Sequence, residues 1–231
     1  MTRSFSFGGH IFEIAGDAAL YWPSQRALLV ADLHLEKASA FATTGQMLPP
    51  YDSMATLHEL EMLARQYAVE SVYCLGDNFH DDAGEHRLSG QAAALLRGLI
   101  GCTNWVWITG NHDKGLTGRW GGQSTIEMEV DGILLRHEAE KGCRLREISG
   151  HFHPKFRQHV RGRMVSRRCF VRSERKLIMP AFGALTGGLD AAHVAILTAC
   201  DLDGDERAEA IVPTRTNIAR FDLSALAAFA K

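Results

Sequence analysis

In the first half of the chain, short apolar runs rich in β-branched or aromatic residues alternate with segments whose apolar residues recur at helical spacing. The apolar runs predict strands over residues 11–14 and 19–21, joined by a turn at Gly16-Asp17, and over 27–31, 71–75 and 105–109. The helical spacing predicts helices over 53–67 and 85–99, the first with Asp52 or Ser53 as its N-cap. We therefore expect a β-α-β-α-β first half.

The second half reads mostly as strands, which we predict over residues 126–130, 133–136, 145–149, 169–171, 176–179 and 193–199. No linker, repeat or low-complexity stretch divides the sequence. We therefore expect residues 1–231 to form a single α/β domain of two packed sheets with helices outside. Apolar residues 223–230 would form either a helix packed on the core or a dimer contact.

Composition narrows the class of protein. The 231 residues are 46% hydrophobic and 23% charged, the balance of a globular domain rather than a disordered or fibrous chain. Five scattered cysteines without a Cys-x-x-Cys pair favour neither a disulfide framework nor a thiolate zinc site, and so a reducing cytoplasm is expected. No apolar run approaches the roughly 20 residues of a membrane span, so we expect no membrane partner.

Five predicted strands end abruptly in residues able to bind metal ions or transfer protons. These ends are Asp32-Leu33-His34, Gly76-Asp77-Asn78, Gly110-Asn111-His112-Asp113, His137-Glu138 and Gly150-His151-Phe152-His153. Because ligands gather at the carboxyl ends of strands in open α/β sheets, the five ends can converge on one crevice. A metal site assembled from strand ends is the simplest explanation.

The donor atoms in these segments suit particular metals. Carboxylate and amide oxygens and imidazole nitrogens suit Mn²⁺, Fe or Zn²⁺. The absence of nearby thiolates argues against a structural zinc site of the cysteine type. Seven candidate ligands exceed the need of one ion, whereas two divalent ions about 3.5–4 Å apart would use them all. Such a pair can hold both the attacking and the leaving oxygen of a phosphoryl group.

These motifs, in this order, resemble the calcineurin-like metallophosphoesterase superfamily. The resemblance implies a four-layer α-β-β-α sandwich of two mixed sheets with outer helices. It implies one metal held by Asp32, His34, Asp77 and His153, and a second held by Asp77, Asn111, His137 and His151. In that family the histidine of the Asn-His-Asp triplet lies over the substrate and either protonates the leaving oxygen or stabilises the transition state. The aspartate beside it orients its ring. Those roles fall on His112 and Asp113.

One motif departs from the broad superfamily. Where many members carry Gly-Asp-x-x-Asp-Arg, this chain has His80 and Asp81 in the last two positions. His80 is therefore either a support for the metal ligands or an exposed loop residue. This departure, together with segments 45–51, 136–138 and 179–189, is similar to the bacterial ligase-associated DNA damage response branch. That branch implies a DNA endonuclease whose partners are a DNA ligase, a helicase and an exonuclease.

The net charge of −2 hides an uneven distribution. Residues 141–176 hold twelve basic and two acidic residues, a net charge of +10, and the remainder of the chain therefore carries −12. Such a stretch is the footprint expected of a surface that neutralises nucleic-acid phosphates, or else a solvated arginine-rich hairpin. The candidate phosphate contacts are Lys155, Arg157, Arg161, Arg163, Arg167 and Arg168. Phe152, Phe156 and Phe170 are possible stacking faces for bases, whereas Trp105 and Trp107 are expected in the core.

The leading hypothesis is a phosphodiesterase with two metal ions, Mn²⁺ by preference, acting on nucleic acid. A phosphatase or cyclic-nucleotide phosphodiesterase of small molecules is the first alternative. A scaffold that binds repair proteins without turnover is the second.

Overall fold

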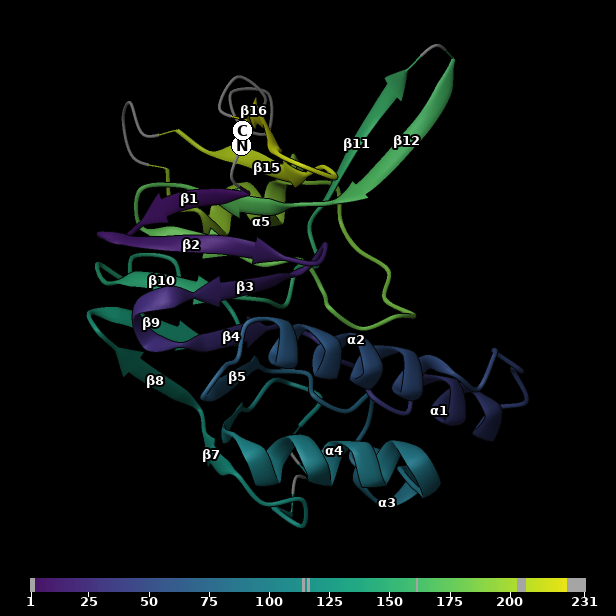
Figure 1. Cartoon of the computed structure of the whole chain (residues 1–231). Coiled ribbons are helices and arrows are strands. Elements are labelled where there is room, and N and C mark those ends of the chain that lie inside the picture. Colours follow the sequence, from purple (N-terminus) through teal and green to yellow (C-terminus); the bar gives the residue numbers. More distant parts are fainter. Residues whose placement is uncertain (1–2, 114, 116, 161, 203–206, 224–231) are drawn as a thin grey trace.

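A computed structural model describes residues 3–113, 115, 117–160, 162–202 and 207–223 of the chain (Figure 1). Within them the strands form two seven-stranded sheets and a separate two-stranded hairpin. Residues 223–230, for which a core helix or a dimer contact was considered, lie outside this part except for Leu223, which is buried. No helix in the described ranges is long and apolar enough to cross a membrane.

The first sheet is antiparallel on one side and parallel on the other. Its strands, in spatial order, are β1 (Ser4–Phe7), β2 (His10–Ala15), β3 (Ala19–Trp22), β4 (Ala27–Val30), β5 (Ser71–Leu75), β6 (Asn104–Ile108) and β7 (Gln123–Thr125). Strands β1 to β4 pair antiparallel, and β4 to β7 pair parallel. A short 3-10 turn, η1 (Pro23–Gln25), joins β3 to β4. The predicted hairpin and buried strands of the first half are confirmed.

The second sheet also mixes the two pairing modes. Its spatial order is β16 (Ile218–Asp222), β15 (Glu209–Pro213), β13 (Phe170–Arg172), β14 (Lys176–Ile178), β10 (Arg146–Ser149), β9 (Ile133–Arg136) and β8 (Glu127–Val130). Strand β10 pairs parallel with both β9 and β14, and the remaining pairs are antiparallel.

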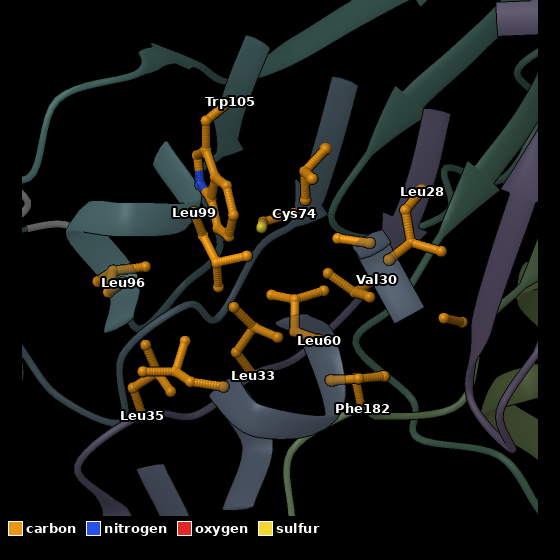
Figure 2. Packing of buried hydrophobic residues seen from close by; sticks show 14 of the residues in the cluster. Leu28, Val30, Leu33, Leu35, Leu60, Cys74, Leu96, Leu99, Trp105 and Phe182 are labelled. Carbon is orange, nitrogen blue, oxygen red and sulfur yellow. The ribbon is translucent and has the colours of Figure 1, made fainter. Parts of the chain in front are cut away.

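Alternation of side chains along the strands separates the apolar core into layers. Leu29 of β4 faces the other sheet, and Leu28 and Val30 face outward, since side chains alternate along a strand. The outward side chains pack against α2 (Asp52–Gln66) and α4 (Gly90–Cys102), as Figure 2 shows for Leu60, Leu96 and Leu99. Helix α5 (Val194–Ala199) covers the second sheet. The expected four-layer α-β-β-α sandwich is confirmed, with Trp105 and Trp107 in its core.

Two predicted elements are wrong. Residues 193–199 form helix α5 and not a strand, because the His193 side chain accepts the amide of Ala195 and its apolar residues pack against the second sheet. The helix predicted over 85–99 is divided into α3 (Gly84–Arg87) and α4. The break lies at extended Ser89 and at Gly90, whose φ of 58° ends the helical path.

Several further elements were not predicted, among them strands β1, β7, β15 and β16. Helix α1 (Lys37–Thr43) is short. The backbone amide of Ala38 in its first turn donates to the carboxylate of the distant Asp52 at 3.0 Å. Strands β11 (Lys155–Val160) and β12 (Arg163–Arg168) pair in antiparallel register and project from the sandwich as an arm (Figure 1).

A fully buried ion pair joins neighbouring strands of the second sheet. The Lys176 ammonium lies 2.7 Å from a Glu147 carboxylate oxygen, and it also donates to the carbonyl of Glu140. Burial alone would raise the pKa of Glu147, but hydrogen bonds from Cys143, Lys176 and Arg136 outweigh it and hold that pKa below its ordinary value. The stabilisation from this carboxylate is therefore present above the unfolded-state pKa and is lost as the pH falls through the acid range.

We predict that Glu147→Leu lowers the free energy of unfolding by about 3–5 kcal/mol, because it leaves the Lys176 ammonium buried without a counter-charge. Chemical denaturation at neutral pH measures the loss. The double variant Glu147→Leu/Lys176→Met should recover most of it. A double variant as unstable as the single one would contradict this account.

Candidate active site

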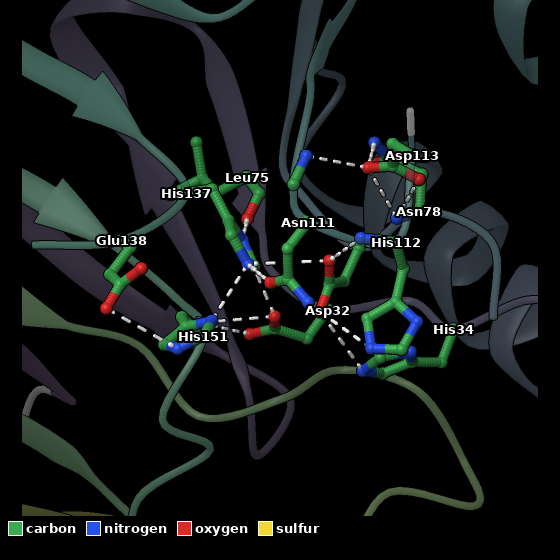
Figure 3. A network of polar contacts seen from close by, with 12 residues as sticks. Asp32, His34, Leu75, Asn78, Asn111, His112, Asp113, His137, Glu138 and His151 are labelled. Carbon is green, nitrogen blue, oxygen red and sulfur yellow. Dashed lines mark hydrogen bonds and ion pairs between the residues drawn. The ribbon is translucent and has the colours of Figure 1, made fainter. Parts of the chain in front are cut away.

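The polar strand ends meet at one edge of the sandwich (Figure 3). The first sheet supplies the loops after β4, β5 and β6, and the second sheet supplies those after β9 and β10. Backbone hydrogen bonds tie these loops together. The amide of Asp32 donates to Gly76 O at 3.1 Å, and the amide of His34 donates to Asp77 O at 2.9 Å. The predicted convergence of five strand ends on one place is thus what the fold produces.

One group of donor atoms consists of Asp32, His34 and His153, whose candidate ligand atoms lie within 4.8 Å of one another. The Nε2 atom of His153 is 3.3 Å from Asp32 Oδ1 and 3.4 Å from His34 Nε2. These three side chains therefore point at a common space, as ligands of one cation would.

The second group consists of Asp77, His137 and His151, again within 4.8 Å. His137 Nε2 is 3.4 Å from Asp77 Oδ1, 3.1 Å from His151 Nδ1 and 3.0 Å from the Asn111 side-chain oxygen. The other ring nitrogen of His137 is 3.1 Å from Leu75 O. A carbonyl can only accept, so Nδ1 carries the proton and Nε2 keeps a lone pair for a metal.

Asp77 lies between the two groups. Its Oδ1 faces His137, while its Oδ2 is 3.8 Å from His34 Nε2 in the first group. A carboxylate with one oxygen toward each group can bridge two cations. Together the seven predicted ligands form a continuous set.

The donor chemistry fits divalent metal ions. Asp32 is fully buried and Asp77 is almost so. Burial, together with the neighbouring cationic and imidazole groups, lowers the pKa of His34 to about 2, and burial also lowers the pKa of His151. These imidazoles are therefore neutral at physiological pH, with lone pairs for a metal, and His34 and His151 do not supply charge against the two carboxylates.

The backbone at the ligands is unusual. Asp32, His34, Asp77, His151 and His153 all have a positive φ, between 44° and 70°. Residues other than glycine rarely adopt this left-handed region, and such strain gathers at functional sites. The fold therefore imposes these side-chain directions rather than merely permitting them.

Two glycines of the motifs are required by close approach. A Cβ at Gly76 would lie 2.2 Å from His137 Nδ1, and one at Gly150 would lie 2.4 Å from Asp32 Oδ2. Any larger side chain would push a candidate ligand out of place. This explains why Asp77 and His151 each follow a glycine.

His112 stands at the mouth of the cluster. Its Nδ1 is 2.8 Å from the carbonyl oxygen of His80, so it donates there, and its Nε2 is directed toward Asp77 Oδ2 at 3.9 Å. The His80 ring stacks on the His112 ring with 5.6 Å between centroids, and Phe41 of α1 also stacks on His80. His112 is thereby held with one nitrogen toward the candidate metal ligands.

Asp113 was expected to orient the His112 ring, but its carboxylate contacts other groups. It accepts hydrogen bonds from the amides of Gly110, Asn78 and Phe79 and from the Asn78 side chain, at 2.8–3.2 Å. Burial raises its pKa, although the backbone hydrogen bonds oppose the rise. Asp113 thus ties the loops after β5 and β6 together, and the His80 carbonyl fixes the ring.

The basic stretch does not form one surface. Lys176 is buried with Glu147, and Arg172 pairs with Glu209. On the hairpin, Lys155, Arg157 and Arg168 donate to the carbonyls of Thr186, Gly188 and Gly183, respectively. Arg163 and Arg167 are exposed on the opposite face of the hairpin, and Arg161 lies outside the described residues.

The three phenylalanines of the stretch have different surroundings. Phe170 is fully buried between the sheets, and Phe156 stacks on Phe221 at 4.0 Å between centroids. Phe152 lies edge-on to His151 at 5.0 Å. Phe170 is therefore a core residue and cannot stack on a base.

The sequence assigned no role in the cluster to Glu138 or to Phe41. Glu138 Oε1 lies 3.6 Å from His151 Nε2, and the signal for it was its position directly after His137. His80 was left between two interpretations, and the structure places it against His112. Nothing local to the sequence shows that Phe41 covers it.

Comparisons with known proteins indicate the family and the fold. The profile of the calcineurin-like phosphoesterase family matches residues 25–163. Among solved structures, a nuclease MPE from Pseudomonas putida is 27% identical, covers 91% of this chain and 96% of its own, and superposes with a TM-score of 0.68. The phosphoesterase Yfce from E. coli is 12% identical, covers 85% of this chain and 98% of its own, and superposes with a TM-score of 0.43. No curated protein matches the sequence.

We predict that Asp113→Ala lowers the free energy of unfolding by about 2–4 kcal/mol, because it leaves several buried amides without an acceptor. Equilibrium denaturation measures this loss, and the ring signals of His112 in an NMR spectrum report the displaced loop. Glu129→Ala removes an exposed carboxylate from strand β8 and serves as the control, with an expected change within about 0.5 kcal/mol. Equal stability of the two variants would refute the tying role of Asp113.

Proposed function

Because this chain belongs to the calcineurin-like phosphoesterase family, we propose that it is a phosphodiesterase that uses two divalent metal ions to cleave nucleic acid. The observation that carries the proposal is the position of Asp77 between two groups of metal-binding side chains. The family implies a metal-dependent phosphoester hydrolase. The use of two ions and a polymeric substrate are the additional parts of this proposal.

Each group supplies the ligands for one ion. Asp32, His34, His153 and one oxygen of Asp77 would hold the first. Asn111, His137, His151 and the other oxygen of Asp77 would hold the second. When bound, two such ions stabilise the charge that develops on the phosphoryl oxygens during displacement. The mixed oxygen and nitrogen donors favour Mn²⁺, and Fe or Zn²⁺ are also compatible.

The chain itself supplies an acid for the leaving group. Since His112 donates through Nδ1 to His80 O, its free nitrogen is Nε2, on the side of Asp77. A protonated Nε2 at this position would transfer its proton to the leaving oxygen of the ester. His80 and Phe41 keep the ring in this plane through stacking.

A nucleic-acid substrate is supported by two observations. The solved structure with 27% identity and near-complete coverage is a nuclease. The hairpin of β11 and β12 projects from the sandwich (Figure 1), begins two residues after His153, and carries the exposed arginines Arg163 and Arg167. We extend the proposal to DNA and to a role in repair with a DNA ligase, a helicase and an exonuclease, in line with the motifs of the sequence.

We predict that Asp77→Asn and His112→Ala abolish Mn²⁺-dependent hydrolysis of bis-p-nitrophenyl phosphate. For His112→Ala the loss should be about 10²–10⁴-fold and larger for a nucleotide ester, whose leaving alkoxide needs the proton more than p-nitrophenolate does. His58→Ala, on the exposed face of α2, is the matched control. Metal analysis of the purified proteins should give about two ions per wild-type chain and fewer in Asp77→Asn. Wild-type turnover in either site variant would defeat the mechanism.

A second prediction separates a polymeric from a small substrate. If the protein cleaves nucleic acid, the rate on an oligonucleotide should fall steeply as salt is raised from 50 to 200 mM, whereas hydrolysis of the small diester should change little. The measurement compares single-stranded DNA, duplex DNA, RNA, a cyclic nucleotide and a phosphomonoester under the same conditions. Turnover confined to the cyclic nucleotide or the monoester would show that the substrate is a small molecule.

A further inference from the structure

A cavity separate from the candidate active site lies at the base of the hairpin of β11 and β12. Its volume is about 940 Å³, and it is enclosed by the end of β12, the segment after β15, and residues near the N-terminus and the turn after β2. Figure 1 shows the base of the hairpin beside the end of β15. Arginines come from three of these places: Arg3, Arg167 and Arg168 together, and Arg215. We call it the arginine cavity.

The arginine cavity carries an excess of positive charge. Among the described residues that line it, Asp17, which lies 3.7 Å from Arg3, is the one carboxylate beside the four arginines. Glu59 lies outside the lining, and the charge of Arg168 acts to lower the pKa of its carboxyl against the effect of burial. Arg168 donates a hydrogen bond from Nη2 to Gly183 O. Its guanidinium has further N–H groups that can donate to a ligand. Arg167 and Arg215 make no hydrogen bond or ion pair with any residue the structure describes. Most of the charge is therefore available to an external anion.

Another cavity of the molecule also gathers arginines, but there acidic residues compensate their charge. It has a volume of about 710 Å³ and is also lined by four arginines, but Glu174, Glu209 and Asp222 line it too. Arg220 lies 3.5 Å from Glu209, and Arg207 lies 3.7 Å from Asp222. The protein itself neutralises most of that charge, which it does not do in the arginine cavity.

A short chain of hydrogen bonds connects the arginine cavity to the candidate active site. Arg168, which lines the cavity, donates to Gly183 O at 2.7 Å, and the amide of Gly183 donates to Asp32 O at 3.2 Å. The amide of Phe182 donates in the same way to Ala31 O. The segment 182–183 thus lies on the loop that carries Asp32 and is held by an arginine of the cavity. The two places are close neighbours in the fold.

We propose that the arginine cavity binds a backbone phosphate of the nucleic-acid strand, at a distance from the bond that is cleaved. The inference rests on the proposed function and extends it, because it assigns Arg3 and Arg215 to substrate binding. Guanidinium groups suit this ligand, since their planar donors match two oxygens of a phosphate at once. The cavity would make the enzyme prefer strands long enough to reach it over short ones.

The test is a length series of oligonucleotides cleaved in Mn²⁺ by the wild type, Arg215→Ala and Arg3→Ala. For the wild type, kcat/KM should rise with length until the strand reaches the cavity and then level off. In both variants the ratio of kcat/KM on the longest strand to that on bis-p-nitrophenyl phosphate should fall several-fold. The slope of log Kd against log salt for a single strand should become shallower by about 0.7 for each lost contact.

Arg207→Ala is the matched control, since it removes one exposed arginine from the compensated cavity. Arg215→Lys keeps the charge without the planar fork and should recover part of the loss. If Arg215→Ala and Arg3→Ala match the control at every length and in salt slope, the inference is overturned while the proposed function stands. If the wild type hydrolyses the small diester but cleaves no oligonucleotide of any length, the nucleic-acid function itself fails.

Discussion

The burial of two carboxylates at one edge of the sandwich is the constraint on which the candidate site depends. Asp32 and Asp77 lie at the base of the candidate site with side-chain exposures of 0% and 5%. Backbone amides of His151 and His112 donate to them, but His34 is neutral because burial takes its pKa to about 2. Cations beside buried carboxylates offset the cost of removing their charge from water. The donor atoms around both carboxylates are arranged to admit such cations, and the arrangement needs two sheets to bring the strand ends together.

The sequence predicted much of this site because its signal is local. A ligand pair that directly follows a buried strand is visible as a short motif, and the order of the motifs is visible along the chain. Gly76 and Gly150, which a side chain would make impossible beside His137 and Asp32, were visible as parts of the same motifs. The two buried sheets followed from apolar runs with alternating outward and inward faces.

The features that the sequence did not predict depend on contacts between distant residues. The apolar residues of 193–199 suit a strand as well as a helix, and only packing against the second sheet decides for the helix. His112 is oriented by a carbonyl 32 positions away rather than by its neighbour Asp113. The basic run looked like one surface, but the fold sends Lys176 into the interior and the hairpin arginines to two opposite faces. Sequence separation gives no measure of these distances in space.

The left-handed backbone at five candidate ligands affects how substitutions there should be read. An L-residue held in this region costs roughly 1–2 kcal/mol, and Asp and His tolerate it better than alanine does because short polar side chains bond locally. An alanine variant of Asp77 or His151 therefore removes a ligand and also changes the energy of the main chain. A glycine variant at the same position removes the ligand without that steric cost, although glycine loses more backbone entropy on folding than alanine does. Both variants lack the ligand, so the difference between their free energies of unfolding contains no contribution from metal. It reports the backbone energy of holding a side chain in the left-handed conformation at that position.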